Sequence, residues 1–388
     1  MIWKVRFVIK KFFSLILTLI MIAGLSTTAL ASNLSMDTKN DDHTKSVESI
    51  YDVVNSSTWQ TMERSDRIAA CQIPSEQLDN LSTFELVQAV LAFPFFVDIY
   101  AFDSIDTGYA CLLSECCALQ TLVTRPDRAD AILSIYENAN VVTDISSDYE
   151  LKQFSHLWNL EMLISQDDFV DIMTENQKDD LVSIAESKYL IKQEIPNMYS
   201  VSSSAFFERA LESESLGLRA IADTVYTPNG SAVTVYKWTS SDVDFTTAEI
   251  NSLNSQCATA YPNATRLANP TRKYNCHSYA WYSQSTSNIR WMNNPSKYMT
   301  DGSYSEVTKI NTSVGDKMVY FTSIDGTNTG INHSAIIVSY TDYPRSKRTF
   351  VVKSKWGQLG LYQHSWADGP YMYWEGNQFP SDLEYYHR

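Results

Sequence analysis

Residues 331–338 read INHSAIIV, and a polar loop separates them from a second apolar run, RTFVVK, at 348–353. β-Branched residues are frequent in both runs, which is typical of buried strands. A Gly-Asp turn at 315–316 precedes a third run, KMVYF, at 317–321. Successive strands joined by short turns predict an antiparallel sheet in this part of the chain.

A β-hairpin is predicted ahead of this sheet. The runs TVYT at 224–227 and SAVTVY at 231–236 lie on either side of Pro228-Asn229-Gly230. Asn-Gly between two β-rich runs is the strongest short-range hairpin signal. We therefore expect a second domain, of α+β class with an antiparallel sheet, over residues 220–388.

Residues 46–194 show a different pattern, with apolar residues at three- and four-residue intervals, and this predicts helices. Ser82 and Glu85 have the spacing of a capping box at a helix start. We expect an all-α N-terminal domain over 46–194. A linker rich in Ser and Glu is expected over 195–219.

Length and charge limit the function classes. The 388 residues exceed one usual core of about 100–200 residues, which predicts two domains. The formal net charge of −15 argues against nucleic acid as a partner, because an acidic chain repels phosphates. Six cysteines are too few for a disulfide scaffold in a chain of this length.

The first 31 residues are typical of a secretory signal peptide. Basic residues come first, an apolar run follows over 12–25, and Ala29-Leu30-Ala31 fits a cleavage site before Ser32. A retained membrane anchor is the rival interpretation. The polar composition of residues 32–45 predicts a flexible spacer. We expect a secreted, extracellular or cell-wall-associated protein that has no membrane contact after cleavage.

A candidate nucleophile lies in YNCHSYAWY, residues 274–282, after a PTRK turn at 270–273. This segment predicts a helix with Cys276 at or near its start. Unpaired N–H groups and the positive end of the helix dipole favour a thiolate there. Asn275 and Tyr274 could line an oxyanion pocket with the amide of Cys276, or could shape the turn.

The candidate base is His333, expected at the first residue of its strand, where the imidazole projects from the sheet edge. A cysteine needs such an imidazole within hydrogen-bond reach to act as a nucleophile. If the following turn centres near Pro344, the return strand places about residue 355 opposite His333. The group that orients the imidazole is therefore expected from Ser354 or its neighbours.

Simpler interpretations accompany these assignments. Cys276 could form a disulfide with Cys257 in an oxidising compartment. His277 could be the base, although on a helix it is expected to point away from the thiol side. Asp316 is expected to be a turn residue.

Other polar and aromatic residues are interpreted structurally. His156 is expected to be a packed or half-exposed core histidine, because no convergent partner accompanies it. The cysteines of the helical part are expected to pack in the core or to form a disulfide with Cys71. An aromatic group near the C-terminus could line a sugar or peptide groove, or form a wet aromatic surface. The cysteines in question are Cys111, Cys116 and Cys117. The C-terminal aromatic group is Tyr371, Tyr373 and Trp374.

The order of the motifs over about 222–375 resembles secreted papain-like cysteine amidases of the NlpC and CHAP type. Ser354-Lys355-Trp356-Gly357 is similar to the Asn-Ser-Trp-Gly strand of papain-like proteases. On that match Ser354 stands where Asn orients the catalytic His, and Trp356 is the shield. A Ser hydroxyl is a shorter orienter than an amide, so His364, Asp368 or a backbone carbonyl could serve instead.

The resemblance implies a papain-like α+β fold, no cofactor and no metal, and amide hydrolysis through a thioester. It also implies peptidoglycan stem or cross-bridge peptides as substrate. The helical part resembles N-terminal modules of exported proteins from Gram-positive bacteria.

Three functional hypotheses follow. The first is an exported cysteine hydrolase with Cys276, His333 and Ser354 as its catalytic residues. The second is a catalytically lapsed papain-like module that binds glycan or peptide. The third is an adhesion or regulatory protein whose helical domain binds an unknown partner.

Overall fold

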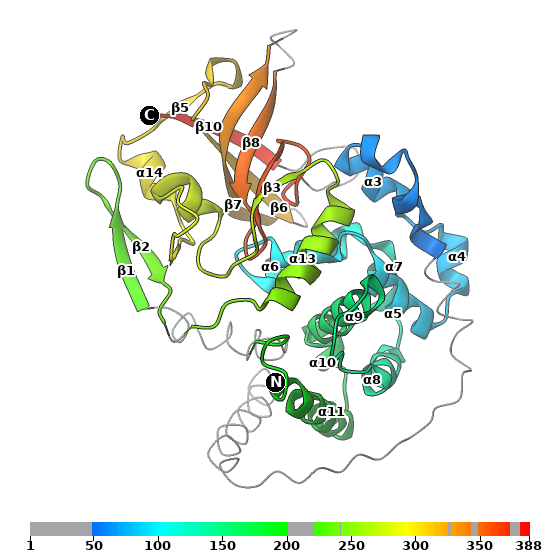
Figure 1. Cartoon of the computed structure of the whole chain (residues 1–388). Coiled ribbons are helices and arrows are strands. Elements are labelled where there is room, and N and C mark those ends of the chain that lie inside the picture. Colours follow the sequence, from blue (N-terminus) through cyan, green and yellow to red (C-terminus); the bar gives the residue numbers. More distant parts are fainter. Residues whose placement is uncertain (1–48, 201–220, 241, 325–326, 343–347, 373–380) are drawn as a thin grey trace.

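A computed structural model describes residues 49–200, 221–240, 242–324, 327–342, 348–372 and 381–388 (Figure 1). The predicted signal peptide 1–31 and spacer 32–45 lie outside these ranges, and so does the 201–219 portion of the predicted linker. The described part has helices in its N-terminal half and antiparallel sheets in its C-terminal half. The predicted α+β class is therefore confirmed.

The N-terminal half is helical as far as residue 193. Local signals begin these helices: Ser82 caps α5 in the predicted capping box with Glu85, and Thr174 caps α11 in the same way. The elements are η1 Ser49–Asn55, η2 Trp59–Thr61, α3 Arg64–Ala70, α4 Ser75–Asn80, α5 Thr83–Ala92, η3 Phe96–Tyr100, α6 Ile105–Glu115, α7 Cys117–Leu122, α8 Arg128–Asn138, α9 Asp148–Ile164, α10 Asp167–Val170 and α11 Glu175–Gln193.

The C-terminal half contains two antiparallel sheets. The smaller has the order β1-β2-β4, and its first two strands form the predicted hairpin, in which Val225 pairs with Val233. The larger has the order β3-β9-β8-β7-β6-β10-β5. The strands are β1 Ile221–Tyr226, β2 Ala232–Lys237, β3 Thr265–Ala268, β4 Arg290–Trp291, β5 Ser305–Val307, β6 Lys317–Ile324, β7 Thr327–Thr341, β8 Thr349–Lys355, β9 Leu361–Ser365 and β10 Ser381–His387.

Four short or medium helical elements belong to the same half. The longest, α13, runs beside α9 and η3, between the large sheet and the N-terminal helices (Figure 1). These elements are α13 Thr247–Ala260, η4 Ser278–Tyr282, α14 Ser296–Thr300 and η5 Lys309–Asn311.

One prediction about the sheet is wrong. His333 is not the first residue of its strand, because β7 begins six residues earlier, at Thr327. Thr327 pairs with Ile324, the last residue of β6. His333 lies opposite Tyr320, next to a register shift in the β6–β7 ladder, and is fully buried. The imidazole is therefore inside the protein rather than at the sheet edge.

The two halves share one hydrophobic core. Phe95 of the helical half contacts Tyr261 edge-on, with ring centroids 5.7 Å apart, and Tyr261 contacts Trp356 of the sheet half at 4.8 Å. His156 is half-buried on α9, within the range expected for it. All six cysteines are free thiols, so neither alternative disulfide, with Cys71 or between Cys257 and Cys276, is formed.

A buried ion cluster of the helical half contacts the sheet half beside this core. The guanidinium of Arg64 donates hydrogen bonds to Glu115 Oε1 at 2.7 Å, Asp98 Oδ2 at 2.9 Å and Tyr261 Oη at 3.1 Å. It also donates to the backbone carbonyl of Met372 at 2.9 Å. Burial raises the pKa of Asp98 to about 6, although the charge of Arg64 opposes that rise.

Replacing Arg64 with Met should destabilise the protein by about 3–5 kcal/mol, because the two carboxylates would stay buried without their cation. The free energy of unfolding in urea measures this loss. Arg290→Met is the matched control, since Arg290 pairs with Asp223 at the surface and the change should cost below about 1 kcal/mol. Equal losses in the two variants would contradict this role of Arg64.

Candidate active site

Cys276 is the first helical residue of the segment that continues into η4. Asn275 caps this segment: its Oδ1 accepts the N–H of Ser278 at 3.1 Å and the N–H of Met292 at 3.1 Å. Cys276 is 1% exposed, and η4 packs against β7 and β8. The predicted position of Cys276 at a helix start is confirmed.

Three chemically reactive groups meet at this helix start. A carboxylate oxygen of Asp103, the thiol sulfur of Cys276 and a ring nitrogen of His277 all lie within 4.8 Å of one another. Nε2 of His277 is 3.4 Å from Oδ2 of Asp103. Asp103 belongs to the helical half, in the turn between η3 and α6. We call Asp103, Cys276 and His277 the reactive cluster.

Hydrogen bonds fix both partners of the thiol. Nδ2 of Asn275 donates to Oδ1 of Asp103 at 2.9 Å. Nδ1 of His277 lies 2.9 Å from Oγ of Ser334, and Nε1 of Trp281 donates to the same oxygen at 2.9 Å. Because the indole N–H can only donate, Ser334 Oγ accepts a hydrogen bond from Trp281. The same hydroxyl forms a second hydrogen bond with Nδ1 of His277.

The surroundings of His277 favour its charged form. Burial lowers the pKa of this imidazole, but the charges of Cys276 and Asp103 outweigh burial and raise the pKa to about 10. This environment favours the imidazolium form, in which both ring nitrogens carry a proton. Nδ1–H faces Ser334, and Nε2–H lies on the side of Asp103.

The expectation that His277 points away from the thiol is wrong. A ring nitrogen of His277 lies within 4.8 Å of the Cys276 sulfur, and the segment widens into the π-helical turn η4 directly after it, at Ser278. Ser334 and Asp103 then hold the imidazole from its two nitrogens, beside Cys276.

His333 has a different environment. Its ring stacks on Tyr371 with centroids 3.5 Å apart and 9° between the planes. Neither ring nitrogen forms a hydrogen bond within the described part of the chain. Burial, together with the charges of His277 and His364, lowers the pKa of His333 well below its ordinary value, so the ring is neutral.

Ser354 does not hold the ring of His333, contrary to the prediction. β8 and β9 pair Ser354 with Tyr362, which puts His364 at the diagonal position on the same face. Oγ of Ser354 lies 2.8 Å from Nε2 of His364, and Nε1 of Trp356 donates to Ser354 at 3.1 Å. Trp356 therefore covers a Ser354–His364 pair.

The two residues predicted for an oxyanion pocket have structural contacts. Both N–H bonds of the Asn275 amide are used, because Nδ2 donates to Asp103 and, at 2.7 Å, to the carbonyl of Met292. Tyr274 is buried and stacks on Tyr279, with ring centroids 6.3 Å apart. Asn275 thus orients Asp103. Of the three groups predicted to bind an oxyanion, the backbone N–H of Cys276 is the one not used in these contacts.

Sequence reasoning missed Asp103, Ser334 and Lys355. Lys355 is buried and donates to the carbonyls of Thr271 at 3.0 Å and Gly357 at 2.6 Å. Burial lowers the pKa of Lys355 to about 7, against the charges of Asp244 and Cys276. Asp103 belongs to no recognisable sequence motif. Ser334 directly follows His333, and this position could have suggested it as a hydrogen-bond partner of His277.

The reactive cluster also contains the donor types of a metal site. Thiolate, imidazole and carboxylate are the ligands that Zn²⁺ prefers. Among the described residues, the set that comes close enough to hold an ion is Asp103, Cys276 and His277. No metal site was predicted here from the sequence.

Comparison of the chain with protein-family models, with curated proteins and with solved structures gives no match. Among the described helices, none combines the length and apolar character needed to cross a membrane.

Asp103→Asn should lower the pKa of His277 from about 10 toward the ordinary value, because the carboxylate charge that helps to raise it is removed. Titration of the His277 ring by NMR measures the change. Asp106→Asn, on the exposed face of α6, is the matched control and should leave the titration unchanged. An unaltered His277 titration in Asp103→Asn would rule out the contact.

Proposed function

We propose that this protein is a cysteine hydrolase that cleaves an amide bond, with Cys276 as nucleophile, His277 as acid and base, and Asp103 as the residue that positions the imidazole. The convergence of these three groups within 4.8 Å carries the proposal. A nucleophile, a base beside it and a third group that orients the base are the parts such a site needs.

The reaction uses the charge state of His277. The Cys276 thiolate attacks the amide carbon, and the carbonyl oxygen becomes an oxyanion that the backbone N–H of Cys276 stabilises. The His277 imidazolium then gives its proton to the leaving amine, so that the C–N bond breaks and a thioester remains. Neutral His277 next takes a proton from water, which attacks the thioester and releases Cys276.

Asp103 marks the route to the sulfur. Cys276 and His277 are buried, whereas the Asp103 side chain is 27% exposed. Substrate would therefore approach over the Asp103 turn, between the two halves of the chain. Asp103 would also stabilise the imidazolium at each step in which the ring carries two protons.

The substrate proposal rests on the sequence. The signal-peptide pattern in 1–31 and the resemblance to NlpC- and CHAP-type amidases support an exported, papain-like enzyme that acts on cell-wall peptide. The helix start at Cys276, packed against the antiparallel strands β7 and β8, is consistent with that papain-like arrangement. In this proposal, His277 and Asp103 take the roles that the resemblance gives to His333 and Ser354.

Cys276→Ala should reduce hydrolysis of a peptidoglycan stem peptide by at least about 10³-fold, because the thioester can no longer form. Release of amine from purified peptidoglycan fragments measures turnover. Cys257→Ala is the matched control, since Cys257 is an equally buried thiol on α13 outside the cluster. Turnover that survives in Cys276→Ala would reject the nucleophile.

Two histidine variants identify the base. His277→Gln should lower kcat by about 10³-fold or more, since proton transfer to the amine is lost. His333→Gln should lower kcat far less, because its neutral ring stacks on Tyr371 rather than bonding to a partner. The reverse order of losses, with both variants folded by circular dichroism, would make His333 the base.

A binding module is the second candidate, and the 1% exposure of Cys276 is the observation that favours it. Such a module would hold glycan or peptide without cleaving it. The comparison of wild type with Cys276→Ala separates the two functions, because a binding module shows no turnover in either protein and equal binding in both.

A further inference from the structure

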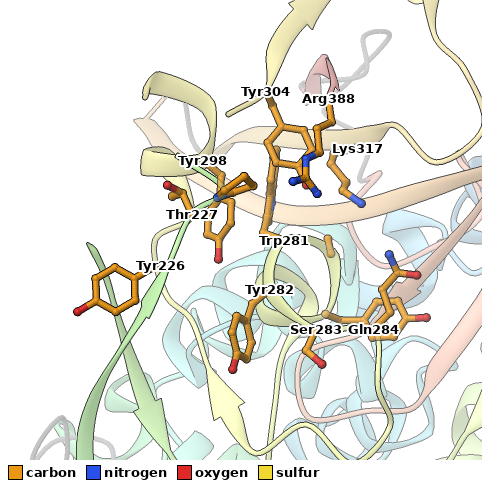
Figure 2. A pocket seen from close by; sticks show the side chains of 13 residues that line it. Tyr226, Thr227, Trp281, Tyr282, Ser283, Gln284, Tyr298, Tyr304, Lys317 and Arg388 are labelled. Atoms are coloured by element: carbon orange, nitrogen blue, oxygen red, sulfur yellow. The ribbon is translucent and has the colours of Figure 1, made fainter. Parts of the chain in front are cut away.

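A cavity of about 560 Å³ lies at the far end of the segment that begins with Cys276 (Figure 2). Neither Cys276 nor any other member of the reactive cluster lines it. Its walls come from the end of the β1–β2 hairpin, from η4 and the residues after it, from α14 and the nearby Tyr304, and from Lys317 at the start of β6 and Arg388. The lining residues are Tyr226, Thr227, Pro228, Tyr279, Ala280, Trp281, Tyr282, Ser283, Gln284, Tyr298, Tyr304, Lys317 and Arg388.

Aromatic rings form much of this wall. Trp281 contacts Tyr304 edge-on at 5.1 Å and Tyr298 at 5.7 Å, so these three rings support one another. Tyr282 is 40% exposed and leaves ring surface available to a ligand. The buried hydroxyl of Tyr298 has no hydrogen-bond partner in the described part of the chain. The ring of Tyr282 thus offers a flat apolar face to a ligand, supported from behind by the buried rings.

The cavity is basic although the chain is acidic. Lys317 and Arg388 lie on the Tyr304 side of the cavity in Figure 2, and the lining contains no Asp or Glu. Lys317 is 5% exposed, and the charge of the neighbouring Asp316 acts on its ammonium without a hydrogen bond or salt bridge between the two described residues. A buried cation without such a contact favours an anion from outside.

We infer that this cavity binds an acidic saccharide, in which a pyranose ring packs on the aromatic wall and a carboxylate or phosphate meets Lys317 and Arg388. Aromatic faces suit the apolar C–H face of a sugar ring. The polar lining residues Thr227, Ser283 and Gln284 suit its hydroxyl groups.

The cavity is linked to the reactive cluster through one wall residue. Nε1 of Trp281 donates to Oγ of Ser334, which also holds Nδ1 of His277. A saccharide bound at this wall would therefore lie beside the hydrogen bonds that link Trp281 to the imidazole. The interpretation of this saccharide as part of the substrate rests on the proposed function. The binding of a saccharide in the cavity does not depend on that function.

Isothermal titration of the full chain tests the inference with three sugars that share one ring and one N-acetyl group. N-acetylmuramic acid carries a carboxylate, N-acetylglucosamine 1-phosphate carries a phosphate, and N-acetylglucosamine carries no charge. At least one anionic sugar should bind about tenfold or more tightly than the neutral one. The tighter of the two identifies the anion. Equal affinities for all three sugars, or no binding, would overturn the inference.

Variants place the binding in this cavity. Lys317→Met should remove the preference for the anionic sugar, and Tyr282→Ala, at an exposed position, should weaken binding of all three sugars. Lys297→Met is the matched control on the exposed side of α14 and should change nothing. Unchanged binding in both cavity variants would overturn the site.

The same titrations on Cys276→Ala separate this inference from the proposed function. Retained binding with lost turnover supports both. Turnover in wild type without sugar binding overturns the cavity alone, and sugar binding without turnover in wild type overturns the hydrolase alone.

Discussion

The buried guanidinium of Arg64 bonds to residues of both halves of the chain, to Asp98 and Glu115 in the helical half and to Tyr261 and the Met372 carbonyl in the sheet half. It satisfies Asp98, Glu115 and Tyr261 at once, and a charge group of this kind tolerates no rearrangement without leaving an ion unpaired in the interior. Asp98 lies within η3, so the cluster also fixes the turn that follows it. That turn carries Asp103 to the helix start at Cys276. The geometry of the candidate active site therefore depends on an ion cluster that contains none of its residues.

Further contacts hold the same turn against the sheet half. The N–H of Gln358 donates to the carbonyl of Tyr100 at 2.9 Å, and the hydroxyl of Tyr371 donates to the carbonyl of Ala101. Gly357 has a φ of +45°, and a Cβ at this position would lie 2.4 Å from the Ala101 oxygen, so a side chain is excluded there. The helical half thus supplies a residue of the reactive cluster and shares the core, which weighs against the hypothesis that it works as a separate adhesion module.

Charge separates the three buried histidines into two classes. The charges beside His277 raise its pKa, whereas burial lowers the pKa of His333 and of His364. Like charges would repel across this small volume, so one imidazolium is compatible with two neutral rings. The charged ring is the one able to protonate a leaving group, and the neutral rings can pack on Tyr371 and Trp356 without a counter-ion.

Periodicity, caps and turn residues by themselves determined the helical half, the β1–β2 hairpin, the strand content and the helix start at Cys276. These features depend on hydrogen bonds and burial patterns within a few neighbouring residues. Only the tertiary structure decided that a ring nitrogen of His277 lies within 4.8 Å of the thiol, that Ser354 serves His364, and that Asp103 joins the cluster. Asp103 bonds to a residue 172 positions away, and such a contact depends on how the ion cluster and the common core pack the halves together, which no local pattern encodes.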